Sequence, residues 1–475
     1  MVDVHISLAG PGDLTSRIYR QLLDAILDGR LRPGDRLPPT RELARRLQVA
    51  RSTVAVAYDR LAAEGYVAAR VGAGTFVENT PIRPRRRSAS SDSAVRARPL
   101  WTELERVEDE PGPPPVHDFR LGTPDTGLFP YAAWRRLVAS ELRASTVRAI
   151  SGYNDSAGHA GLREAVARYV GVSRSVRADA DDVVLTHGAQ QALDLIGRVL
   201  IEPGDPVAVE EPGYPAARLL FRSLGAKVVG VPVDDEGLIV AALPASARIV
   251  YVTPSHQFPL GMPMSAARRA ELLDWAERHD SVIVEDDYDS EFRYGEHPLD
   301  PVQRLDRTGR VIYVGTFSKT LLPVLRLGFL VAPGPLLPAL RTAKRLTDWH
   351  GESISQAALA GLVDCGELSR HVRRATRVYA SRRELILTGL RDELAEWLDP
   401  VESLAGLHMA ARLRPGTDID VEAVRARARQ RGVAVESLAS YCDGGIGERG
   451  LAFGYGAATG ITEGMRLLAE CFTHA

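Results

Sequence analysis

A lysine beside an apolar run is the residue best suited to covalent chemistry in this sequence. Lys319 follows the apolar residues 311–314, and a second apolar run begins two residues after it. Burial lowers the pKa of a lysine amine and makes it nucleophilic, as a Schiff base with an aldehyde requires. Thr316, Ser318 and Arg326 stand close by and could hold a phosphate, which arginine can bind through two hydrogen bonds. The alternative is a lysine at a strand end that only reaches solvent.

Short apolar runs that alternate with helical stretches must position these side chains. From residue 117 to the C-terminus this alternation predicts an α/β fold with a mainly parallel central sheet and a smaller C-terminal α+β part. Ligands bind at the carboxyl ends of the strands in such sheets, so the residues after each run are candidates for binding. The runs that we predict as strands are residues 183–185, 207–209, 249–252, 282–284 and 311–314.

Two of these strands lead into residues that suit a phosphorylated ring. Gly188, Ala189 and Gln190 open a helix after the first strand, where free backbone N–H groups and the helix dipole favour an anion. Tyr214 follows the second strand and could stack on a planar ring. A tyrosine at such a place could equally be part of the core.

An acidic segment follows residues 282–284. Asp286 there could pair with a protonated pyridine nitrogen, and Tyr288 could donate a hydrogen bond to an oxygen of the same ring. A metal site or a solvated loop is the alternative for an acidic cluster. We expect no metal, because no histidine or third carboxylate stands nearby at a matching spacing.

The first eighty residues predict a separate small domain. Apolar residues at helical spacing indicate a helix over 14–27, a second helix opens at Thr40 as its N-cap, and a third begins at residue 51. Residues 66–77 then predict a hairpin with a glycine-rich tip. Three helices and a hairpin form a winged helix-turn-helix, whose third helix enters the major groove of DNA.

The sequence of this domain resembles the GntR family of bacterial DNA-binding domains. The resemblance rests on residues 37–44, 64–67 and 72–77. It implies contact with double-stranded operator DNA, whereas a helical domain used for protein contacts is the alternative. The residues that it assigns to DNA are Arg41, Arg51, Ser52, Thr53, Gly72 and Gly74.

Composition and spacing set the domain boundaries. Residues 81–116 contain a basic run, a serine-rich run and a proline-rich end, which predict a flexible linker between a 1–80 domain and a 117–475 domain. We place the smaller C-terminal part from about residue 345. The basic run could add sequence-independent DNA phosphate contacts or could be a solvated spacer.

The composition excludes several classes of protein. Three scattered cysteines in 475 residues give no disulfide framework and fit a reducing cytosol. The sequence shows no signal peptide and no apolar run long enough to cross a membrane, so we expect a cytoplasmic protein without a membrane partner. The net charge of −2 does not by itself identify a partner.

From about residue 118 onward the segments together resemble the class I aminotransferases, which are pyridoxal 5′-phosphate (PLP) enzymes of fold type I. The resemblance implies that Lys319 forms the internal aldimine, Asp286 holds the pyridine nitrogen, Tyr288 meets the ring oxygen and Tyr214 lies on the ring face. Tyr153 matches a tyrosine that reaches the phosphate of a partner subunit. The residues implied for the phosphate are Gly188, Ala189, Gln190, Thr316, Ser318 and Arg326.

Two positions depart from the aminotransferase pattern. Phe258 stands where those enzymes have an asparagine at the ring oxygen, and His256 or Gln257 could substitute for it. Ala452 stands where an arginine would hold the substrate α-carboxylate, and Arg449 is nearby but outside the apparent strand. A charge-assisted pair is worth roughly 1.5–3 kcal/mol, so ordinary amino acids would lose their main anchor.

A GntR-type domain joined to an aminotransferase-like domain resembles the MocR family of bacterial transcriptional regulators over nearly the whole chain. This resemblance implies a head-to-tail homodimer in which PLP, or a PLP adduct of an amino-compound effector, alters operator binding. Genes of vitamin B6 or amino-acid metabolism are candidate targets. The alternatives are a PLP-dependent aminotransferase with an accessory DNA-binding domain and a DNA-binding protein whose second half is only a dimerisation scaffold.

Overall fold

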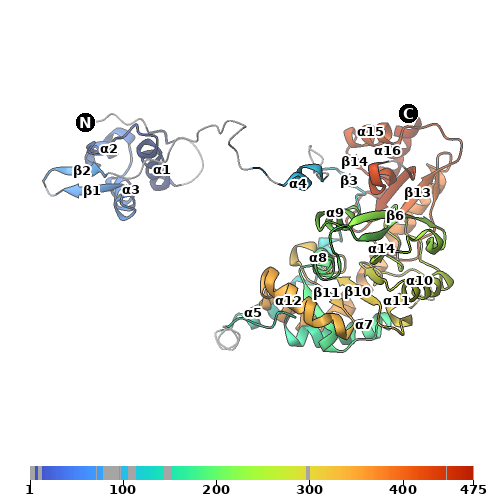
Figure 1. The fold of residues 1–475 in the computed structure, drawn as a ribbon. Coiled ribbons are helices and arrows are strands. Elements are labelled where there is room, and N and C mark those ends of the chain that lie inside the picture. Colours follow the sequence, from blue (N-terminus) through green and yellow to red (C-terminus); the bar gives the residue numbers. More distant parts are fainter. Residues whose placement is uncertain are drawn as a thin grey trace. The chain divides into compact units, whose positions relative to one another are not determined.

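The computed structural model divides the chain into two compact units, residues 1–98 and 99–475 (Figure 1). It describes residues 6–8, 13–70, 72–78, 96, 98–104, 114–143, 152–295, 300–445 and 447–473. Most of the predicted 81–116 linker, including its basic run, lies outside the described residues, but the part that is described contains a short helix, α4 (Pro99–Glu103).

The N-terminal unit has three helices and a two-stranded hairpin. Asp13 caps the first helix by accepting a hydrogen bond from the Ser16 N–H at 2.9 Å, and the buried side chains of the helix recur at helical spacing. Thr40 is the first residue of the second helix, and Pro39 rather than Thr40 occupies the N-cap. The elements are α1 (Leu14–Leu27), α2 (Thr40–Leu47), α3 (Arg51–Ala63), β1 (Val67–Arg70) and β2 (Gly74–Val77).

The hairpin depends on a glycine at the start of its second strand. β1 and β2 pair antiparallel, with Val67 opposite Val77 and Arg70 opposite Gly74. Gly74 has φ +112°, and a Cβ at this position would lie 2.6 Å from the Arg36 Nε. A side chain at residue 74 would therefore strain the backbone and displace Arg36.

The C-terminal unit is built on an eight-stranded sheet, and six of its strands run in the same direction. Five of these six are adjacent, and one antiparallel strand separates them from the sixth. β11 (Gly328–Val331) is antiparallel to both of its neighbours, and β7 (Gly237–Leu238) is antiparallel at one edge. Four strands are buried along their whole length, as expected for a sheet that is covered on both faces. In spatial order the strands are β4 (Val183–Thr186), β11 (Gly328–Val331), β10 (Val311–Thr316), β9 (Val282–Asp287), β8 (Ile249–Val252), β5 (Pro206–Glu211), β6 (Lys227–Asp234) and β7 (Gly237–Leu238).

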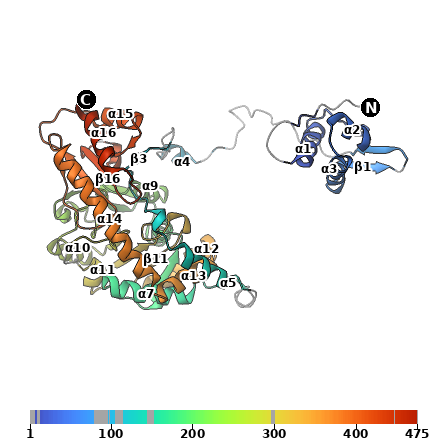
Figure 2. The same ribbon diagram turned by 180° about the vertical axis from the view of Figure 1, so that it is seen from behind.

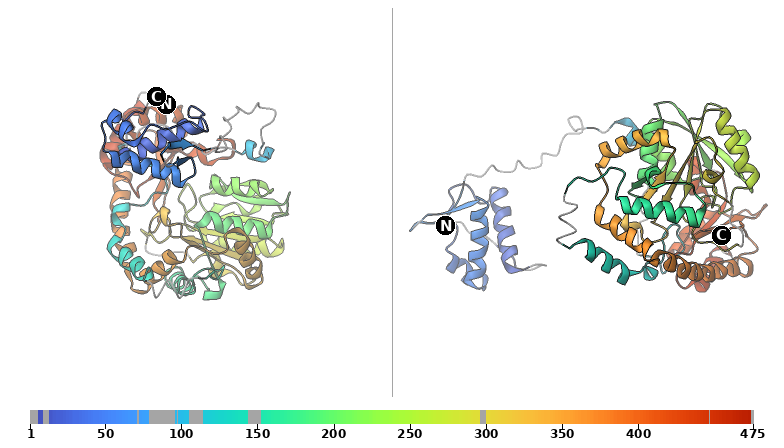
Figure 3. Two further views of the ribbon diagram at one scale, coloured as in Figure 1. Left: turned by 90° about the vertical axis from the view of Figure 1, so that its left-hand side faces the viewer. Right: turned by 90° about the horizontal axis from the view of Figure 1, so that it is seen from below.

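Helices cover both faces of this sheet (Figure 3). Alternate residues of a strand point to opposite faces. Tyr313 packs with α7 (Ala160–Arg174) and α13 (Ser353–Asp364), whereas Ile312 and Val314 pack with α8 (Ala189–Leu200) and α12 (Leu337–Asp348). No helix among the described residues is long and apolar enough to cross a membrane. The helices of this layer are α5 (Tyr131–Glu141), α7 (Ala160–Arg174), α8 (Ala189–Leu200), α9 (Pro215–Ser223), α10 (Ala266–Arg278), α11 (Val302–Leu305), α12 (Leu337–Asp348) and α13 (Ser353–Asp364).

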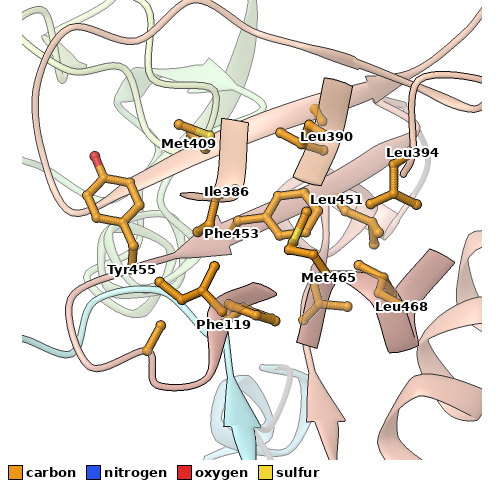
Figure 4. Close-up of a cluster of buried hydrophobic side chains, with 14 of the residues drawn as sticks. Phe119, Ile386, Leu390, Leu394, Met409, Leu451, Phe453, Tyr455, Met465 and Leu468 are labelled. Carbon is orange, nitrogen blue, oxygen red and sulfur yellow. The ribbon is translucent and has the colours of Figure 1, made fainter. Parts of the chain in front are cut away.

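A smaller part follows, built on a four-stranded sheet. α12 and α13 pack on the large sheet layer, and so does Leu368 at the start of the long helix α14 (Glu367–Asp392), whereas Ile386 and Leu390 further along this helix pack in the smaller part (Figure 2). Phe119, Ile386, Phe453 and Met465 meet in its core (Figure 4). Its other elements are β12 (Leu398–Pro400), β13 (His408–Leu413), α15 (Val421–Gln430), β15 (Glu436–Ser437), β16 (Gly450–Gly454) and α16 (Ile461–Thr473), with β14 (Val433–Ala434) pairing with β3 (His117–Asp118).

Candidate functional site

A cavity of about 320 Å³ opens at the carboxyl ends of the parallel strands of the large sheet. This is within the size range of small-molecule sites. Both parts of the C-terminal unit contribute to its walls. The predicted site residues that line it are Ala189, Gln190, Tyr214, Asp286, Tyr288, Thr316, Ser318, Lys319 and Arg326.

Lys319 lies just beyond β10 with its amine at the cavity wall. Its Nζ donates a hydrogen bond to the Gly122 carbonyl oxygen at 2.7 Å. Burial lowers the pKa of the Lys319 amine, although the carboxylates of Asp289 and Asp286 oppose this shift. Gly122 must be a glycine, because it has φ +85° and a Cβ there would lie 2.6 Å from Nζ. The lysine is therefore held in place and is more readily neutral and nucleophilic than an exposed one.

Asp286 presents one free carboxylate oxygen. Its Oδ2 accepts a hydrogen bond from the Tyr251 hydroxyl at 2.8 Å, whereas its Oδ1 is buried without a partner. Burial raises the pKa of Asp286 to about 7. A buried unpaired acceptor at a cavity wall fits a protonated ring nitrogen, which would supply both the missing hydrogen bond and a compensating positive charge.

The next residue, Asp287, has a structural role. Its Oδ2 accepts hydrogen bonds from Arg174 at 2.6 Å and from the Tyr313 hydroxyl at 2.5 Å. Burial alone would raise the pKa of Asp287, but the Arg174 guanidinium holds it below its usual value. The strand predicted over residues 282–284 continues as β9 to Asp287, where Arg174 and the Tyr313 hydroxyl pair with the Asp287 carboxylate inside the sheet.

The phosphate end of the cavity combines a helix N-terminus with an arginine. Gly188 is the N-cap of α8 with φ +76°, and a Cβ there would lie 3.0 Å from an Arg326 Nη atom. The Arg326 guanidinium donates to the His187 carbonyl oxygen at 2.7 Å. Thr316 and Ser318 form a tight turn in which the Ser318 N–H donates to the Thr316 Oγ1 at 3.1 Å. Together these groups form a cradle of donors for an anion.

Aromatic side chains form the remaining wall. Tyr214 and Phe258 meet edge to face with their ring centroids 5.5 Å apart, and Phe258 also contacts Tyr288 and Tyr441. These rings leave an apolar slot for a planar ligand.

His256 and Gln257, the suggested substitutes for the missing asparagine, do not line the cavity; Phe258 does. The Gln257 amide donates to the Pro212 and Phe258 carbonyl oxygens at 2.9 and 2.8 Å. His256 lies behind Tyr288, whose hydroxyl donates to the His256 carbonyl oxygen at 2.9 Å and lies 3.0 Å from its Nδ1. His256 therefore positions Tyr288 rather than reaching a ligand itself.

Behind the cavity, folding brings two histidines beside an acidic residue, which the sequence spacing did not indicate. His256, Asp289 and His408 are buried, with one ligand-type atom of each within 4.8 Å of the others. The His256 Nδ1 lies 2.9 Å from the Asp289 Oδ1, and its Nε2 lies 3.1 Å from the Ser403 Oγ. Burial lowers the pKa of His408 well below its usual value. Two histidines beside a carboxylate could ligate a metal, but the hydrogen bonds of His256 already give this cluster a structural role.

Three further positions lie away from the cavity. Tyr153 is 82% exposed and packs against Trp349, with ring centroids 4.9 Å apart. Arg449 donates to the Ile419 carbonyl oxygen at 2.9 Å and does not line the cavity. Ala452 is fully buried inside β16.

Further polar groups and close contacts of the cavity wall were not predicted from the sequence, among them those of Glu436, Tyr441, Gly122 and Tyr251. Glu436 and Tyr441 come from the small sheet region, Gly122 from the segment after β3, and Tyr251 from β8. Only the pairing of distant strands brings them to Lys319.

In the N-terminal unit, the predicted DNA-contacting residues of the helices lie on α2 and at the start of α3. Arg41, Arg51 and Ser52 are exposed, whereas Thr53 is half-buried. The Arg51 Nε donates to the Thr40 Oγ1 at 3.4 Å, which joins the two helices of the motif. Gly72 and Gly74 lie at the turn and the second strand of the hairpin.

Two protein families match the chain in the expected order. Residues 14–77 match the model of the bacterial regulatory proteins of the gntR family. Residues 122–441, well over half of the chain, match the model of aminotransferase class I and II. The C-terminal unit therefore has the PLP-dependent transferase fold of type I, and its cofactor is PLP.

The similar proteins include both regulators and enzymes. The chain is 37% identical to a probable rhizopine catabolism regulatory protein, MocR, of Rhizobium meliloti, over 96% of this chain and 93% of that protein. It is 32% identical to the pyridoxine biosynthesis transcriptional regulator PdxR of Corynebacterium glutamicum, over 94% and 93% of the two chains. A crystal structure of Pyrococcus horikoshii kynurenine aminotransferase matches with a TM-score of 0.70 at 30% identity, covering 81% of this chain and 96% of that one. With its gntR domain, its aminotransferase-like domain and its likeness to whole regulators, this chain belongs to the MocR family of PLP-dependent, DNA-binding transcriptional regulators.

Proposed function

We propose that the chain acts in the cytoplasm as a head-to-tail homodimer on an operator with two half-sites, and that an amino-compound effector acting with PLP changes operator affinity. A dimer presents two winged helix-turn-helix units, so two half-sites follow from its symmetry. The effector must bind two conformations with different affinity, because otherwise it cannot shift the equilibrium between them.

The observation that carries this proposal is a cavity with an amine, a free carboxylate oxygen and an anion cradle that suit PLP, in a chain that also has a DNA-binding unit. A dimerisation scaffold would need neither the buried lysine amine at the cavity wall nor the unpaired carboxylate oxygen of Asp286. Both are unfavourable for folding unless a ligand satisfies them.

The residues of the cavity have distinct tasks toward PLP. Lys319 supplies the amine for covalent attachment, and Asp286 would accept the ring N–H with its free Oδ1. Gly188 and Arg326 form the anion cradle, and Tyr214 lies at the slot for the ring face. When bound, PLP supplies an aldehyde carbon that reacts with primary amines, which makes the site a receptor for amines.

The proposed DNA contacts follow the exposed surface of the winged motif. Arg51 and Ser52 begin α3, where the side chains of a recognition helix reach base edges, and Arg41 lies on α2. The hairpin turn at Gly72 and Gly74 would approach the DNA backbone or minor groove. Thr53 is half-buried and would contribute at the edge of this surface.

The test is fluorescence anisotropy with the DNA upstream of the chain's own gene, at fixed salt. Full-length protein is compared in three states: free of PLP, loaded with PLP, and loaded with PLP plus a primary amine. We expect sequence-specific binding whose affinity differs between the last state and the other two. The Lys319→Ala variant should bind this DNA but should not respond to the amine.

Two outcomes would count against the proposal. Equal affinity in all three states would remove the effector role of the cavity. Absence of specific binding, combined with steady turnover of an amino donor and a keto acid, would instead support the aminotransferase alternative.

A further inference from the structure

We propose that Glu436 selects the effector, and that it favours primary amines whose far end carries a second cationic group instead of a carboxylate. This inference rests on the proposed amine-receptor function of the cavity. It concerns the part of the cavity wall that PLP does not need.

Once PLP is bound, one charged side chain of the described part of the cavity wall is left to meet an effector. Among the described residues that line the cavity, the side chains that carry charge are Asp286, Lys319, Arg326 and Glu436. Asp286 and Lys319 are used by PLP, and Arg326 lies at the phosphate end, where it donates to the His187 carbonyl oxygen at 2.7 Å. The remaining charge is therefore the carboxylate of Glu436, and no lining arginine is left for an effector carboxylate.

Strand pairing places this carboxylate beside Ala452 on one face of the small sheet. β15 and β16 pair antiparallel with Glu436 directly opposite Ala452, and Ala410 of β13 is opposite Ala452 on the other side. Side chains that are directly opposite project on the same face of a sheet. By the resemblance to aminotransferases, Ala452 takes the place of the arginine that holds a substrate carboxylate. Ala452 is buried and does not line the cavity, whereas Glu436 does, so the side chain of this pair that can meet a ligand is an acid.

The hydrogen bonds of Glu436 leave room for a ligand. The Tyr441 hydroxyl donates to its Oε2, and the Leu121 N–H donates to its Oε1 at 3.3 Å. Each carboxylate oxygen can accept a further hydrogen bond. Burial raises the pKa of Glu436 to about 7, and an ammonium group beside it would restore the charged form. A carboxylate ligand would instead be repelled.

The inference is tested by titrating PLP-loaded, full-length protein with three ligand series of matched chain length. These are α,ω-diamines, the corresponding monoamines and the corresponding ω-amino acids, and the apparent dissociation constant is read from the PLP absorbance. For the best-fitting length, we expect the diamine to bind about tenfold or more tightly than the monoamine, the range of a charge-assisted hydrogen bond, and the ω-amino acid to bind most weakly.

The Glu436→Gln variant keeps the size and hydrogen-bonding capacity of the side chain but removes its charge. It should bring the affinity for the diamine close to the affinity for the monoamine. Glu448→Gln is the matched control: Glu448 is an acid of the same region that pairs with Arg412 at 3.2 Å and does not line the cavity, so the variant should keep the preference of the parent protein.

The outcomes of this titration distinguish failure of the Glu436 inference from failure of the amine-receptor function. If amines change the spectrum but diamines have no advantage, or if Glu436→Gln weakens all three series equally, Glu436 only holds Tyr441 and Leu121 and the inference is wrong. If no amine in any series changes the PLP spectrum, the amine-receptor function itself fails and the inference fails with it.

Discussion

Replacing Asp286 with asparagine tests the assignment of the ring-nitrogen partner most directly. The change keeps an acceptor for the Tyr251 hydroxyl, which lies 2.8 Å from the Oδ2, but removes the negative charge and the free Oδ1 that face the cavity. A hydrogen bond to a charged group contributes about 1.5–3 kcal/mol, which corresponds to roughly 10- to 150-fold weaker PLP binding. Equilibrium dialysis of PLP against the PLP-free variant measures this loss.

Although Asp286→Asn should weaken PLP binding, it should stabilise the folded protein when PLP is absent. The pKa of Asp286 is raised to about 7 in the folded chain, against about 3.9 in the unfolded chain, so the folded form holds the proton more tightly. Ionising the buried carboxyl therefore destabilises the PLP-free protein as the pH rises between about 4 and 7, and asparagine avoids this loss. We expect the Tm difference in favour of Asp286→Asn to increase over that range.

Glu210→Gln is the matched control for this pair of measurements. Burial also raises the pKa of Glu210 to about 7, but Glu210 does not line the cavity. The control should reproduce the pH-dependent gain in Tm without weakening PLP binding. If Asp286→Asn binds PLP as well as the parent, or if Glu210→Gln weakens it equally, Asp286 is not the partner of the ring nitrogen.

Three further predictions concern the lysine, the buried ion pair and the DNA-binding unit. Lys319→Ala should fold normally, and borohydride treatment with PLP should leave no phosphopyridoxyl group on the peptide around residue 319; a covalently labelled active site in this variant would contradict the assignment. Asp287→Asn removes the negative charge that lies 2.6 Å from buried Arg174, so urea unfolding of the PLP-free protein should show a loss of about 3–5 kcal/mol, and a loss below about 1 kcal/mol would refute the structural role of the ion pair. Arg51→Ala should weaken operator binding, and its logarithmic salt slope should fall by about one if the arginine contacts a phosphate; an unchanged affinity would place Arg51 outside the interface.

The local patterns of the sequence predicted many of the helices and strands. The helix over 14–27 and the hairpin of β1 and β2 agree with the structure, because helical periodicity and glycine turns depend on neighbouring residues. The strand before Lys319 was predicted for the same reason. β9 was predicted too short because its last residues are acidic. An acidic run usually indicates a loop, unless distant residues such as Arg174 pair with its carboxylates.

The parts of the site that the sequence did not reveal all depend on contacts between distant segments. Glu436 reaches the cavity because β15 pairs with β16, and Gly122 meets Lys319 across 197 residues. His256 and His408 stand beside Asp289 only after the small sheet packs against the large one. The spacing of residues along the sequence does not predict such neighbours, because they depend on the order of the strands in the sheet.

The location of Glu436 bears on how a signal could leave the cavity. Lys319 and Asp286 belong to the large sheet layer, whereas Glu436 and Tyr441 belong to the small sheet region. A ligand that contacts only the large layer binds every arrangement of the small part equally, and it therefore shifts no equilibrium between them. PLP held through Lys319, Asp286 and Arg326 alone would be such a ligand. An amine that joins PLP at one end and Glu436 at the other contacts both parts, so its effect on operator affinity should exceed that of PLP alone.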